Sequence, residues 1–295
     1  MLEPMLAKEF NLKWLDEDYA LQPKLNGHRL IWDGKELWSR TGKKIVSVPG
    51  LVCELEKFFG DFPMDGELFA PTMSFKEITE VGRRTVNITD DLNICMYVYD
   101  APIKNLSFID RYKLIQQAIE FHHFTTISRI QIVKTLFAKK SKTKKLDPKS
   151  LNIYCDKYEG TMVRNANSLY KFGKRSSDLM KIKKFYDTEA VIVGVTQFLS
   201  KEKVLVSKGT PGSKKYADGT YYKDGVKTPQ DMLGSFICKL PNGVEFELGT
   251  GLTHEERKAF WKKPPIGAKV TFQYQEFTEK GVPLFPSYLR IREDI

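Results

Sequence analysis

The sequence Lys24-Leu25-Asn26-Gly27-His28-Arg29 places a lysine at the end of an apolar run, with a glycine and an arginine close behind it. A lysine is a nucleophile only as the neutral amine, a form that burial or neighbouring cations favour. The same residues also fit a simpler structure, because Asn-Gly is a strong signal for a hairpin turn. The hexapeptide alone is compatible with both a nucleophilic lysine and a hairpin turn, and only the residues that follow it along the chain can distinguish the two.

Four further clusters follow in a fixed order, and they contain the residue types that phosphate chemistry needs. Lys181 and Lys183 alternate on a predicted strand, so both side chains would point to one face and could stabilise a polyphosphate. Glu67 and Glu159 lie at predicted strand ends, where a carboxylate could contact a ribose hydroxyl or a magnesium-bound water. A solvated strand face and ordinary turn carboxylates are the competing interpretations. The clusters are Asp65-Gly-Glu-Leu68, Tyr97-Val-Tyr-Asp100, Glu159-Gly-Thr-Met-Val-Arg164 and Leu179-Met-Lys-Ile-Lys183.

The order of these clusters resembles the covalent nucleotidyltransferase superfamily of DNA ligases, RNA ligases and mRNA capping enzymes. The resemblance runs from Pro4-Met-Leu-Ala7 to Phe285-Pro-Ser-Tyr-Leu-Arg-Ile-Arg-Glu-Asp294, and so covers nearly the whole chain. The compact length, together with Gly234-Ser-Phe and Gly249-Thr-Gly251, makes the chain most similar to the minimal two-domain ATP-dependent DNA ligases of viruses and bacteria.

This resemblance implies a mechanism in which ATP and Mg²⁺ are used to seal nicks between 3′-hydroxyl and 5′-phosphate ends in duplex DNA. Lys24 would carry AMP as a phosphoramidate and pass it to the 5′-phosphate, while Lys181 and Lys183 stabilise the triphosphate. Glu67 would contact the ribose and join Glu159 in supporting the metal.

The resemblance also implies further contacts to the nucleotide. An aromatic ring would stack on adenine, an amide would read the adenine edge, and four basic side chains would contact phosphates. These residues are Tyr99, Gln22, Arg29, Arg40, Lys174 and Arg175. A core strand tyrosine and a solvated basic turn at Lys174 and Arg175 are the alternatives that the sequence leaves open.

In the second domain the resemblance implies an OB-fold, with Arg292 and Asp294 closing over ATP in the first step. A polar carboxy-terminal tail is the default for such residues. A lysine- and glycine-rich segment at 200–227 matches the hairpin with which minimal viral ligases encircle DNA, and we expect it to be disordered without DNA. Its candidate phosphate contacts are Lys201, Lys203, Lys208, Lys214 and Lys215.

One residue departs from the pattern of the family. Most relatives have Asp where this chain has Asn26, so a negative charge beside the lysine is missing. Any role of that charge in positioning the metal or Lys24 is in question, although some minimal relatives also lack it and activity is expected.

The elements that must position these residues are mixed strands and helices. Strands are predicted at 19–24, 29–40, 62–69 and 92–99, with helices at 49–60 and 109–122, and Asp33-Gly34 as a hairpin turn. After residue 184 the pattern becomes all-β. We therefore predict an α+β chain: a nucleotidyltransferase domain of ATP-grasp-like antiparallel sheets with helices at 1–184, and an OB-fold barrel at 185–295.

Composition limits the remaining possibilities. The 295 residues carry a formal net charge of +10, which indicates a polyanionic partner such as nucleic acid. The four cysteines lie far apart, and no stretch resembles a leader or a membrane span. We expect a monomer in a reducing compartment, cytoplasmic, or nuclear or in a viral factory in a eukaryotic host, with no membrane partner.

Three alternatives to DNA ligation stay open at this point. An RNA ligase shares the first five clusters, and a capping guanylyltransferase would label Lys24 from GTP. A non-catalytic basic DNA-binding protein would explain the charge but not the ordered clusters. An NAD-dependent ligase is disfavoured, because the chain lacks an extra amino-terminal domain and a four-cysteine zinc site.

Overall fold

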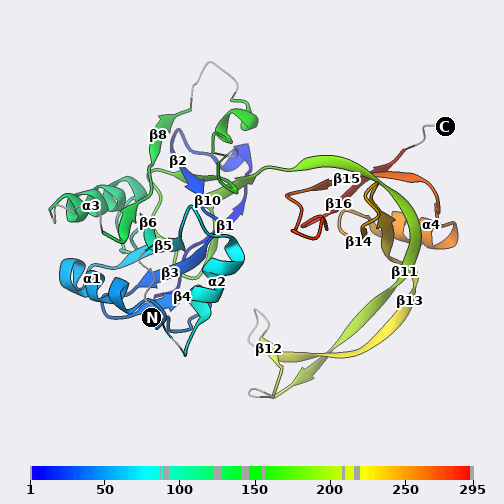
Figure 1. Cartoon of the computed structure of the whole chain (residues 1–295), viewed down its shortest axis with the longest axis horizontal. Coiled ribbons are helices and arrows are strands. Elements are labelled where there is room, and N and C mark those ends of the chain that lie inside the picture. Colours follow the sequence, from blue (N-terminus) through cyan, green and yellow to red (C-terminus); the bar gives the residue numbers. More distant parts are fainter. Residues whose placement is uncertain are drawn as a thin grey trace. The chain divides into compact units, whose positions relative to one another are not determined.

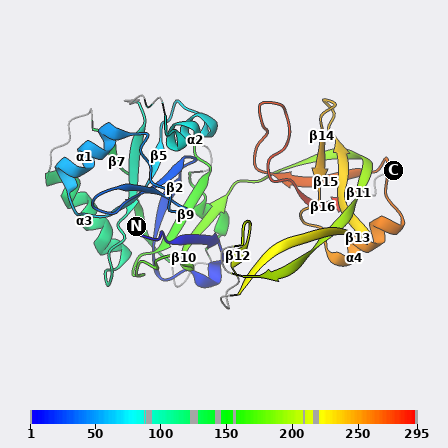
Figure 2. The same cartoon turned by 90° about the horizontal axis from the view of Figure 1, so that it is seen from below.

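The computed structural model describes residues 2–86, 88, 93–121, 128–140, 146–154, 157–207, 210–215 and 220–292. Of Pro148, Lys149, Lys201, Glu202 and the strand Lys214–Lys215 it describes the backbone alone. The chain divides into two compact units, Met1–Lys184 and Phe185–Ile295. Figures 1 and 2 show the elements of each unit from two directions.

In the described residues of unit 1, one five-stranded sheet has the order β1-β10-β9-β2-β8. It contains the strand that carries Lys24, next to the strands that carry two of the other clusters. The strands are β1 (Leu6–Glu9), β2 (Asp18–Lys24), β8 (Leu136–Lys139), β9 (Gly160–Asn165) and β10 (Arg175–Lys183). Only β1 and β10 pair in parallel.

A second five-stranded sheet in the described residues of unit 1 has the order β4-β3-β5-β6-β7. Its strands are β3 (His28–Trp32), β4 (Leu37–Ser39), β5 (Met64–Phe69), β6 (Cys95–Asp100) and β7 (Ile130–Ile132). The helices of the unit are α1 (Pro49–Phe59), α2 (Phe75–Arg83) and α3 (Phe108–Phe121), with short 3-10 turns at Leu12–Trp14 and Pro148–Leu151. Buried side chains such as Trp32, Leu55 and Met96 join this sheet to its helices in one core.

The structure rules out the alternative interpretation of Asn26-Gly27 as a hairpin turn. Strands β2 and β3 on either side of it belong to different sheets, so the chain crosses from one sheet to the other here. A Cβ added to Gly27 would lie 2.3 Å from the carbonyl oxygen of Leu68 and 2.8 Å from Cγ of Glu67. The glycine is needed for this close approach, which brings the end of β2 beside β5.

Helix α2 and a helix of the second unit, α4 (His254–Lys262), differ from the prediction, which placed no helix at either position. Both begin with a capping box, in which Ser74 and Thr253 each accept a hydrogen bond from the backbone of the glutamate three residues later. That spacing of Ser or Thr and Glu is a signal visible in the sequence.

The described part of unit 2 forms a six-stranded antiparallel sheet of order β12-β13-β11-β15-β16, with β14 also paired to β13. Its strands are β11 (Tyr186–Val206), β12 (Lys214–Lys215), β13 (Tyr221–Lys239), β14 (Glu245–Leu248), β15 (Lys269–Tyr274) and β16 (Ser287–Ile291). Apolar side chains including Ile192, Phe236 and Phe272 form its core. The predicted α+β class is therefore confirmed.

The described residues of the segment at 200–227 continue β11 and β13 as a long, curved ribbon that ends at β12 (Figure 1). Disorder of this segment in the absence of DNA stays a prediction. Ladder hydrogen bonds satisfy the backbone groups that a loop would leave to water, which explains why a polar segment can still be regular.

Candidate active site

Lys24 lies beside Lys183, and Glu159 bridges them. Lys24 ends β2 and Lys183 ends β10, and both are paired across β9 with Gly160. The carboxylate of Glu159 accepts a hydrogen bond from Nζ of Lys24 through Oε2, and its Oε1 lies 2.6 Å from Nζ of Lys183. The strand order β2-β9-β10 therefore assembles this cluster from residues up to 159 positions apart.

The charges of this cluster act strongly on Glu159. Burial alone would raise the pKa of its carboxyl, but Lys24 and Lys183 more than compensate, and the pKa falls below its ordinary value. Glu159 is therefore an anion at neutral pH, held between two cations. The side chains of Lys24 and Glu159 are still 22% and 21% exposed, so a ligand can reach them.

Lys181 does not join this cluster, in contrast to the prediction. Its Nζ lies 2.8 Å from Oε1 of Glu9, a residue that the sequence analysis did not single out. The parallel pairing of β1 with β10 places Glu9 directly opposite Lys181. No sequence signal indicates this pairing, because β1 and β10 are more than 160 residues apart.

Glu67 approaches the cluster from the second sheet. It lies on β5 opposite Arg29 of β3, and among the described residues its carboxyl has no hydrogen-bond or ion-pair partner. Burial raises the pKa of Glu67 to about 7, against the effect of Arg29 and Lys24, and the nearby Asp65 and Glu159 add to the rise. Near neutral pH this carboxyl is thus half protonated and available to a ligand.

The raised pKa of Glu67 predicts a pH-dependent penalty on stability. Between about pH 4.5 and 7 the folded chain keeps this proton while the unfolded chain loses it, so the free energy of unfolding falls as the pH rises. Above pH 7 the penalty is on the order of 3 kcal/mol. We expect Glu67→Gln to match the parent protein at pH 4.5 and to exceed it in stability at pH 8.

Urea unfolding of both proteins across this pH range measures the difference in their free energies of unfolding. All other titrating groups are common to both proteins, so their contributions cancel in this difference. A stability difference that stays constant from pH 4.5 to 8 would contradict the prediction. The glutamine is close in shape to the protonated acid, so packing differences should be small at every pH.

Arg29 binds a carboxylate in this structure. Its Nε and Nη2 donate to the two oxygens of Asp65 at 2.9 and 2.6 Å, and the hydroxyl of Tyr170 donates to the same carboxylate at 2.7 Å. Asp65 is fully buried, so this bidentate pair fixes the guanidinium in place. Phosphate binding by Arg29 would have to use its remaining N–H groups.

Tyr99 is packed against two guanidinium groups. The central carbons of Arg29 and Arg164 lie 5.7 and 5.6 Å from its ring centre, within the range of cation–π attraction. Burial raises the pKa of the Tyr99 hydroxyl well above its ordinary value, so the phenol stays neutral. Stacking of this ring on adenine stays a prediction.

Gln22 is not placed to read an adenine edge. Only 1% of the residue is exposed, and its amide nitrogen donates to the carbonyl oxygen of Tyr99 at 3.0 Å and to the hydroxyl of Thr135 at 2.9 Å. Its amide oxygen accepts from Nε of Arg164 at 2.8 Å. Since both amide protons are used internally, Gln22 positions Tyr99 and Arg164 instead.

Asp100, Arg111 and Arg164 form a buried charge network that was not predicted, and the guanidinium of Arg164 packs against the ring of Tyr99. Asp100 accepts hydrogen bonds from Nε and Nη2 of Arg111 at 2.8 and 3.1 Å, and from Nη1 of Arg164 at 2.6 Å. Asp100 and Arg111 are fully buried, and Arg164 is 3% exposed. Two of these residues lie in the quoted clusters, but Arg111 on α3 carries no such signal.

The remaining predicted phosphate contacts are exposed. Arg40 follows β4, and Lys174 precedes β10; neither side chain has a partner among the described residues. Arg175 donates to the carbonyl oxygen of Ala7 and so helps to hold β1. The ammonium group of Lys174 thus has no described partner, whereas one nitrogen of the Arg175 guanidinium is occupied.

In unit 2, Arg292 forms an ion pair with Glu189 of β11. Its partner in the prediction, Asp294, lies outside the described residues, as does Lys208. Lys203 is an exposed residue of the ribbon. The backbones of Lys201, Lys214 and Lys215 lie in its strands, but their side chains are not among those described.

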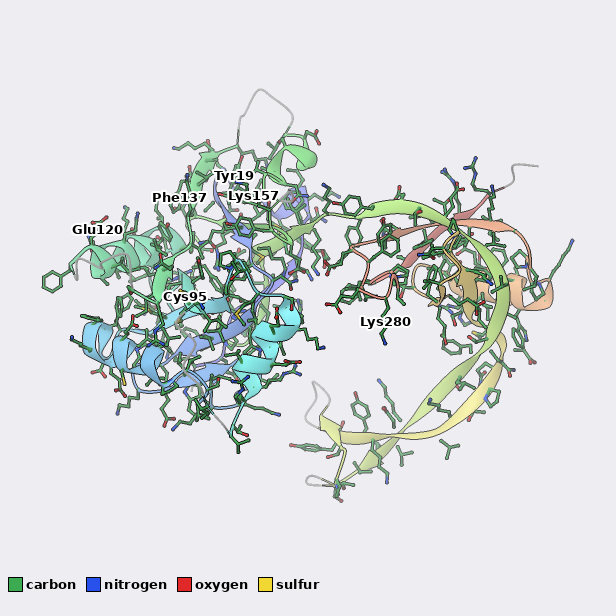
Figure 3. All side chains as sticks on the ribbon, in the orientation of Figure 1. Tyr19, Cys95, Glu120, Phe137, Lys157 and Lys280 are labelled. Atoms are coloured by element: carbon green, nitrogen blue, oxygen red, sulfur yellow. The ribbon has the colours of Figure 1, made fainter. Side chains whose placement is uncertain are left out.

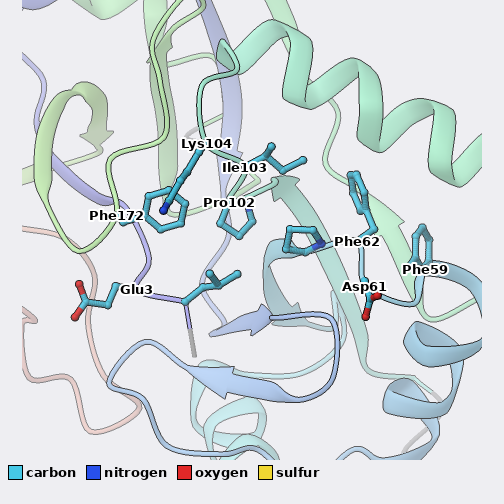
Figure 4. Close-up of a pocket in the computed structure, with 10 residues that line it drawn as sticks. Glu3, Phe59, Asp61, Phe62, Pro102, Ile103, Lys104 and Phe172 are labelled. Atoms are coloured by element: carbon cyan, nitrogen blue, oxygen red, sulfur yellow. The ribbon is translucent and has the colours of Figure 1, made fainter.

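An open, mainly apolar groove of about 1040 Å³ lies elsewhere in unit 1, and Figure 4 shows its lining. Its lining includes Phe59, Phe62, Ile103 and Phe172, together with Glu3. None of the predicted site residues lines this groove, so it does not identify the active site.

In the part of the chain that the structure describes, no group of three or more His, Cys, Asp or Glu side chains is placed to hold a metal ion. None of the helices within the same residues has the length and apolar character needed to cross a membrane.

Two family models of known proteins match this chain, one in each of its two units. Residues 4–183 match the ATP dependent DNA ligase domain, and residues 224–292 match the DNA ligase OB-like domain. A DNA ligase of Haemophilus influenzae is 28% identical over 276 residues, covering 93% of this chain and 87% of that protein. A DNA ligase of African swine fever virus is 27% identical over 325 aligned positions, covering 100% of this chain and 70% of the viral protein.

Solved structures show the same fold. A Lig E DNA ligase, studied for DNA binding with a minimal scaffold, has a TM-score of 0.71 at 26% identity, covering 98% of this chain and 99% of that one. The Chlorella virus DNA ligase-adenylate has a TM-score of 0.52 at 24% identity, covering 100% and 99%. The second likeness supports the fold alone.

Proposed function

Because this chain belongs to the family of ATP-dependent DNA ligases, we propose that Lys24 is its nucleophile and that it seals nicks between 3′-hydroxyl and 5′-phosphate ends in duplex DNA. One observation carries the assignment of Lys24. Lys24, Lys183 and Glu67 come from strands of two different sheets, and Glu159 immediately precedes β9. The four side chains meet at one place, where burial and charge perturb both carboxyls.

In the first step, the ammonium group of Lys24 loses a proton to solvent, and the resulting amine attacks the α-phosphorus of ATP. A nitrogen–phosphorus bond forms as the bond from the α-phosphorus to the pyrophosphate oxygen breaks, pyrophosphate leaves, and the nitrogen releases a second proton to solvent. Glu159 Oε2 accepts the hydrogen bond from this nitrogen and so orients it for attack. Lys183, 2.6 Å from the same carboxylate, supplies positive charge for the phosphate oxygens as negative charge develops on them. Lys174 and Arg40 are exposed cations for the outer phosphates.

The two carboxylates also fit Mg²⁺, which prefers oxygen ligands and commonly uses one or two carboxylates together with water and substrate phosphates. Glu67 is the stronger candidate, because its carboxyl has no protein partner among the described residues. A bound cation would also stabilise its ionised form and so lower the pKa that burial raises. Glu159 could contribute only if one of its lysine contacts opened. When bound, the metal would neutralise charge on the transferring phosphate.

In the second step, the 5′-phosphate at the nick displaces Lys24 from AMP, which restores the amine and forms DNA-adenylate. In the third step, the 3′-hydroxyl attacks the adenylated 5′-phosphate, AMP leaves, and the strand is joined. Positioning the phosphates is the protein's main contribution, and the basic side chains around Lys24 suit that role.

The proposal predicts which nucleotide and which polynucleotide the enzyme uses. We expect labelled ATP, but not GTP, to leave AMP on the protein when Mg²⁺ is present. We expect nicked duplexes with a DNA 3′-hydroxyl strand to be sealed at least tenfold faster than those with an RNA strand. Gel electrophoresis of labelled protein and of labelled strands measures both.

Three results would redirect the assignment. Labelling from GTP would favour a capping enzyme, and preferential joining of RNA strands would favour an RNA ligase. Equal affinity for intact and nicked duplexes without any joining would favour a non-catalytic DNA-binding protein.

A further inference from the structure

The two lysines of β10, Lys181 and Lys183, have acid partners on opposite sides of that strand. Nζ of Lys183 lies 2.6 Å from Oε1 of Glu159, which immediately precedes β9. Nζ of Lys181 lies 2.8 Å from Oε1 of Glu9, the last residue of β1. Strand β10 lies between β1 and β9 in the sheet, so each lysine is neutralised by a carboxylate from a different side.

The core of the sheet shows to which face the Glu9–Lys181 pair belongs. Met180 of β10 is buried in one cluster with Tyr19 of β2, which Figure 3 labels. Side chains alternate along a strand, so Lys181 and Lys24 point to the face opposite this core. Glu9 is paired directly with Lys181 and shares its face. An acid that the mechanism does not use therefore lies on the same face as the proposed nucleophile.

Main-chain contacts hold β1 against β10. The N–H of Phe10 donates to the carbonyl oxygen of Lys181 at 3.0 Å, and the guanidinium of Arg175 donates to the carbonyl oxygen of Ala7. These bonds fix the backbone of Glu9 beside Lys181. Only the two side chains have to move for the ion pair to open.

The two acids differ in how firmly they are held. The side chain of Glu159 is 21% exposed, and both Lys24 and Lys183 bind it. The side chain of Glu9 is 70% exposed, and among the described residues Lys181 is its only ion-pair partner. Water solvates both charges of such an exposed pair, so the pair contributes little free energy. Glu9 is therefore the acid that an incoming anion displaces more readily.

We propose that Glu9 competes with the β- and γ-phosphates of ATP for Lys181: it holds the lysine in the empty site, yields it to the outer phosphates, and takes it back as pyrophosphate departs. This role rests on the proposed ligase function, because the phosphates are those of its nucleotide. Lys181 and Lys183 are two residues apart on one strand, so their Cα atoms are separated by about 7 Å. A polyphosphate bound at Lys183 is thus within reach of the flexible Lys181 side chain. Glu9 is a positioning residue that acts through Lys181.

The competition also affects the reversal of the first step. In the reverse reaction an oxygen of pyrophosphate attacks the α-phosphorus of adenylated Lys24, the nitrogen–phosphorus bond breaks, and ATP forms. The nitrogen takes up two protons from solvent and returns to the ammonium form. A carboxylate that binds Lys181 weakens the binding of pyrophosphate and so disfavours this reversal. Loss of Glu9 should therefore tighten the binding of ATP and of pyrophosphate together.

Nucleotides with and without the outer phosphates test this role. AMP lacks them, whereas ATP with a methylene group between its α- and β-phosphates keeps them but cannot release pyrophosphate, so both ligands bind without reacting. In Glu9→Gln we expect the methylene analogue to bind about two- to fivefold more tightly, the range that an exposed ion pair allows, and AMP to bind as in the parent protein. Isothermal titration calorimetry with Mg²⁺ measures both affinities.

Two further variants separate competition at Lys181 from a change in net charge. Glu36→Gln removes the same charge from an exposed pair with Lys44 in the same unit, and both affinities should stay unchanged. In Lys181→Ala the carboxylate of Glu9 has no lysine to hold, so adding Glu9→Gln should no longer tighten the methylene analogue. Thermal unfolding checks that each variant is folded.

Three outcomes would overturn the role of Glu9 while the parent protein still forms its AMP adduct from ATP. Glu9→Gln could tighten AMP as much as the methylene analogue, it could tighten neither, or the tightening could persist in Lys181→Ala. A parent protein that forms no adduct would instead refute the proposed function, and the role of Glu9 with it.

Discussion

Replacing Lys24 by alanine is expected to abolish the covalent protein–AMP adduct and to reduce nick sealing at least about 1000-fold, because it removes the proposed attacking amine. The residue is 22% exposed and is held by Glu159 beside Lys183, so its loss removes the nucleophile from an otherwise complete cluster. Incubation with labelled ATP and Mg²⁺, followed by denaturing electrophoresis, measures the adduct directly.

Two control variants separate the nucleophile from its charge. Lys24→Arg keeps a cation beside Glu159, but a guanidinium stays protonated and does not attack phosphorus, so it should also form no adduct. Lys44→Ala removes an exposed lysine whose only described partner is Glu36, and the adduct should form normally. An adduct of undiminished intensity in Lys24→Ala would refute the assignment of this residue.

The Lys24 variants also provide a test that bypasses the first step. A DNA strand that already carries AMP on its 5′-phosphate needs only the attack of the 3′-hydroxyl. We expect Lys24→Ala to seal this strand at a substantial fraction of the parent rate, which would show that the site is folded and that the defect lies in adduct formation.

Replacing Asp100 by alanine is expected to cost about 3–5 kcal/mol in the free energy of unfolding, the largest effect on stability that we predict. Asp100 is fully buried and is the shared carboxylate partner of Arg111 and Arg164. Removing one member of a buried ionic group leaves the other charges without compensation, which costs far more than the loss of a surface ion pair. Urea unfolding at pH 7 measures the change.

A surface ion pair on α3 provides the control. Nζ of Lys113 lies 3.7 Å from Asp110 and both side chains are largely exposed, so Lys113→Ala should change stability by less than about 1 kcal/mol. A loss of under 1 kcal/mol for Asp100→Ala would contradict the importance of the network. Because Arg164 also contacts Tyr99 and Gln22, we further expect a raised KM for ATP in any Asp100 variant that folds.

Much of the chemistry could be predicted because the ligase clusters are short and ordered along the chain. Lys24, Glu67, Glu159 and Lys183 were all identified from their neighbours in sequence, and the structure brings them together. The change to an all-β pattern after residue 184 likewise reflects local periodicity, which follows directly from the order of apolar and polar residues.

Other features depended on contacts between distant segments. Asn26-Gly27 has the composition of a hairpin turn, yet the strands on either side of it belong to different sheets. At the crossing between the sheets, Gly27 lies close to the backbone of Leu68, a contact that only the folded chain reveals. Gln22 was expected at the adenine, but its buried amide forms hydrogen bonds with Tyr99 on β6 and Arg164 on β9. Short-range sequence patterns could not predict these contacts, because both partners are far from Gln22 in sequence.

The order of residues was thus sufficient for the family, the α+β class and the proposal of Lys24 as the attacking lysine, since these depend on residue type and short-range spacing. Tertiary structure alone decided that Lys181 pairs with Glu9 and that Arg111 and Arg164 share Asp100. The physical reason is strand register. A side chain's partner and face depend on which strand lies beside it and at what offset, and local propensity does not encode either.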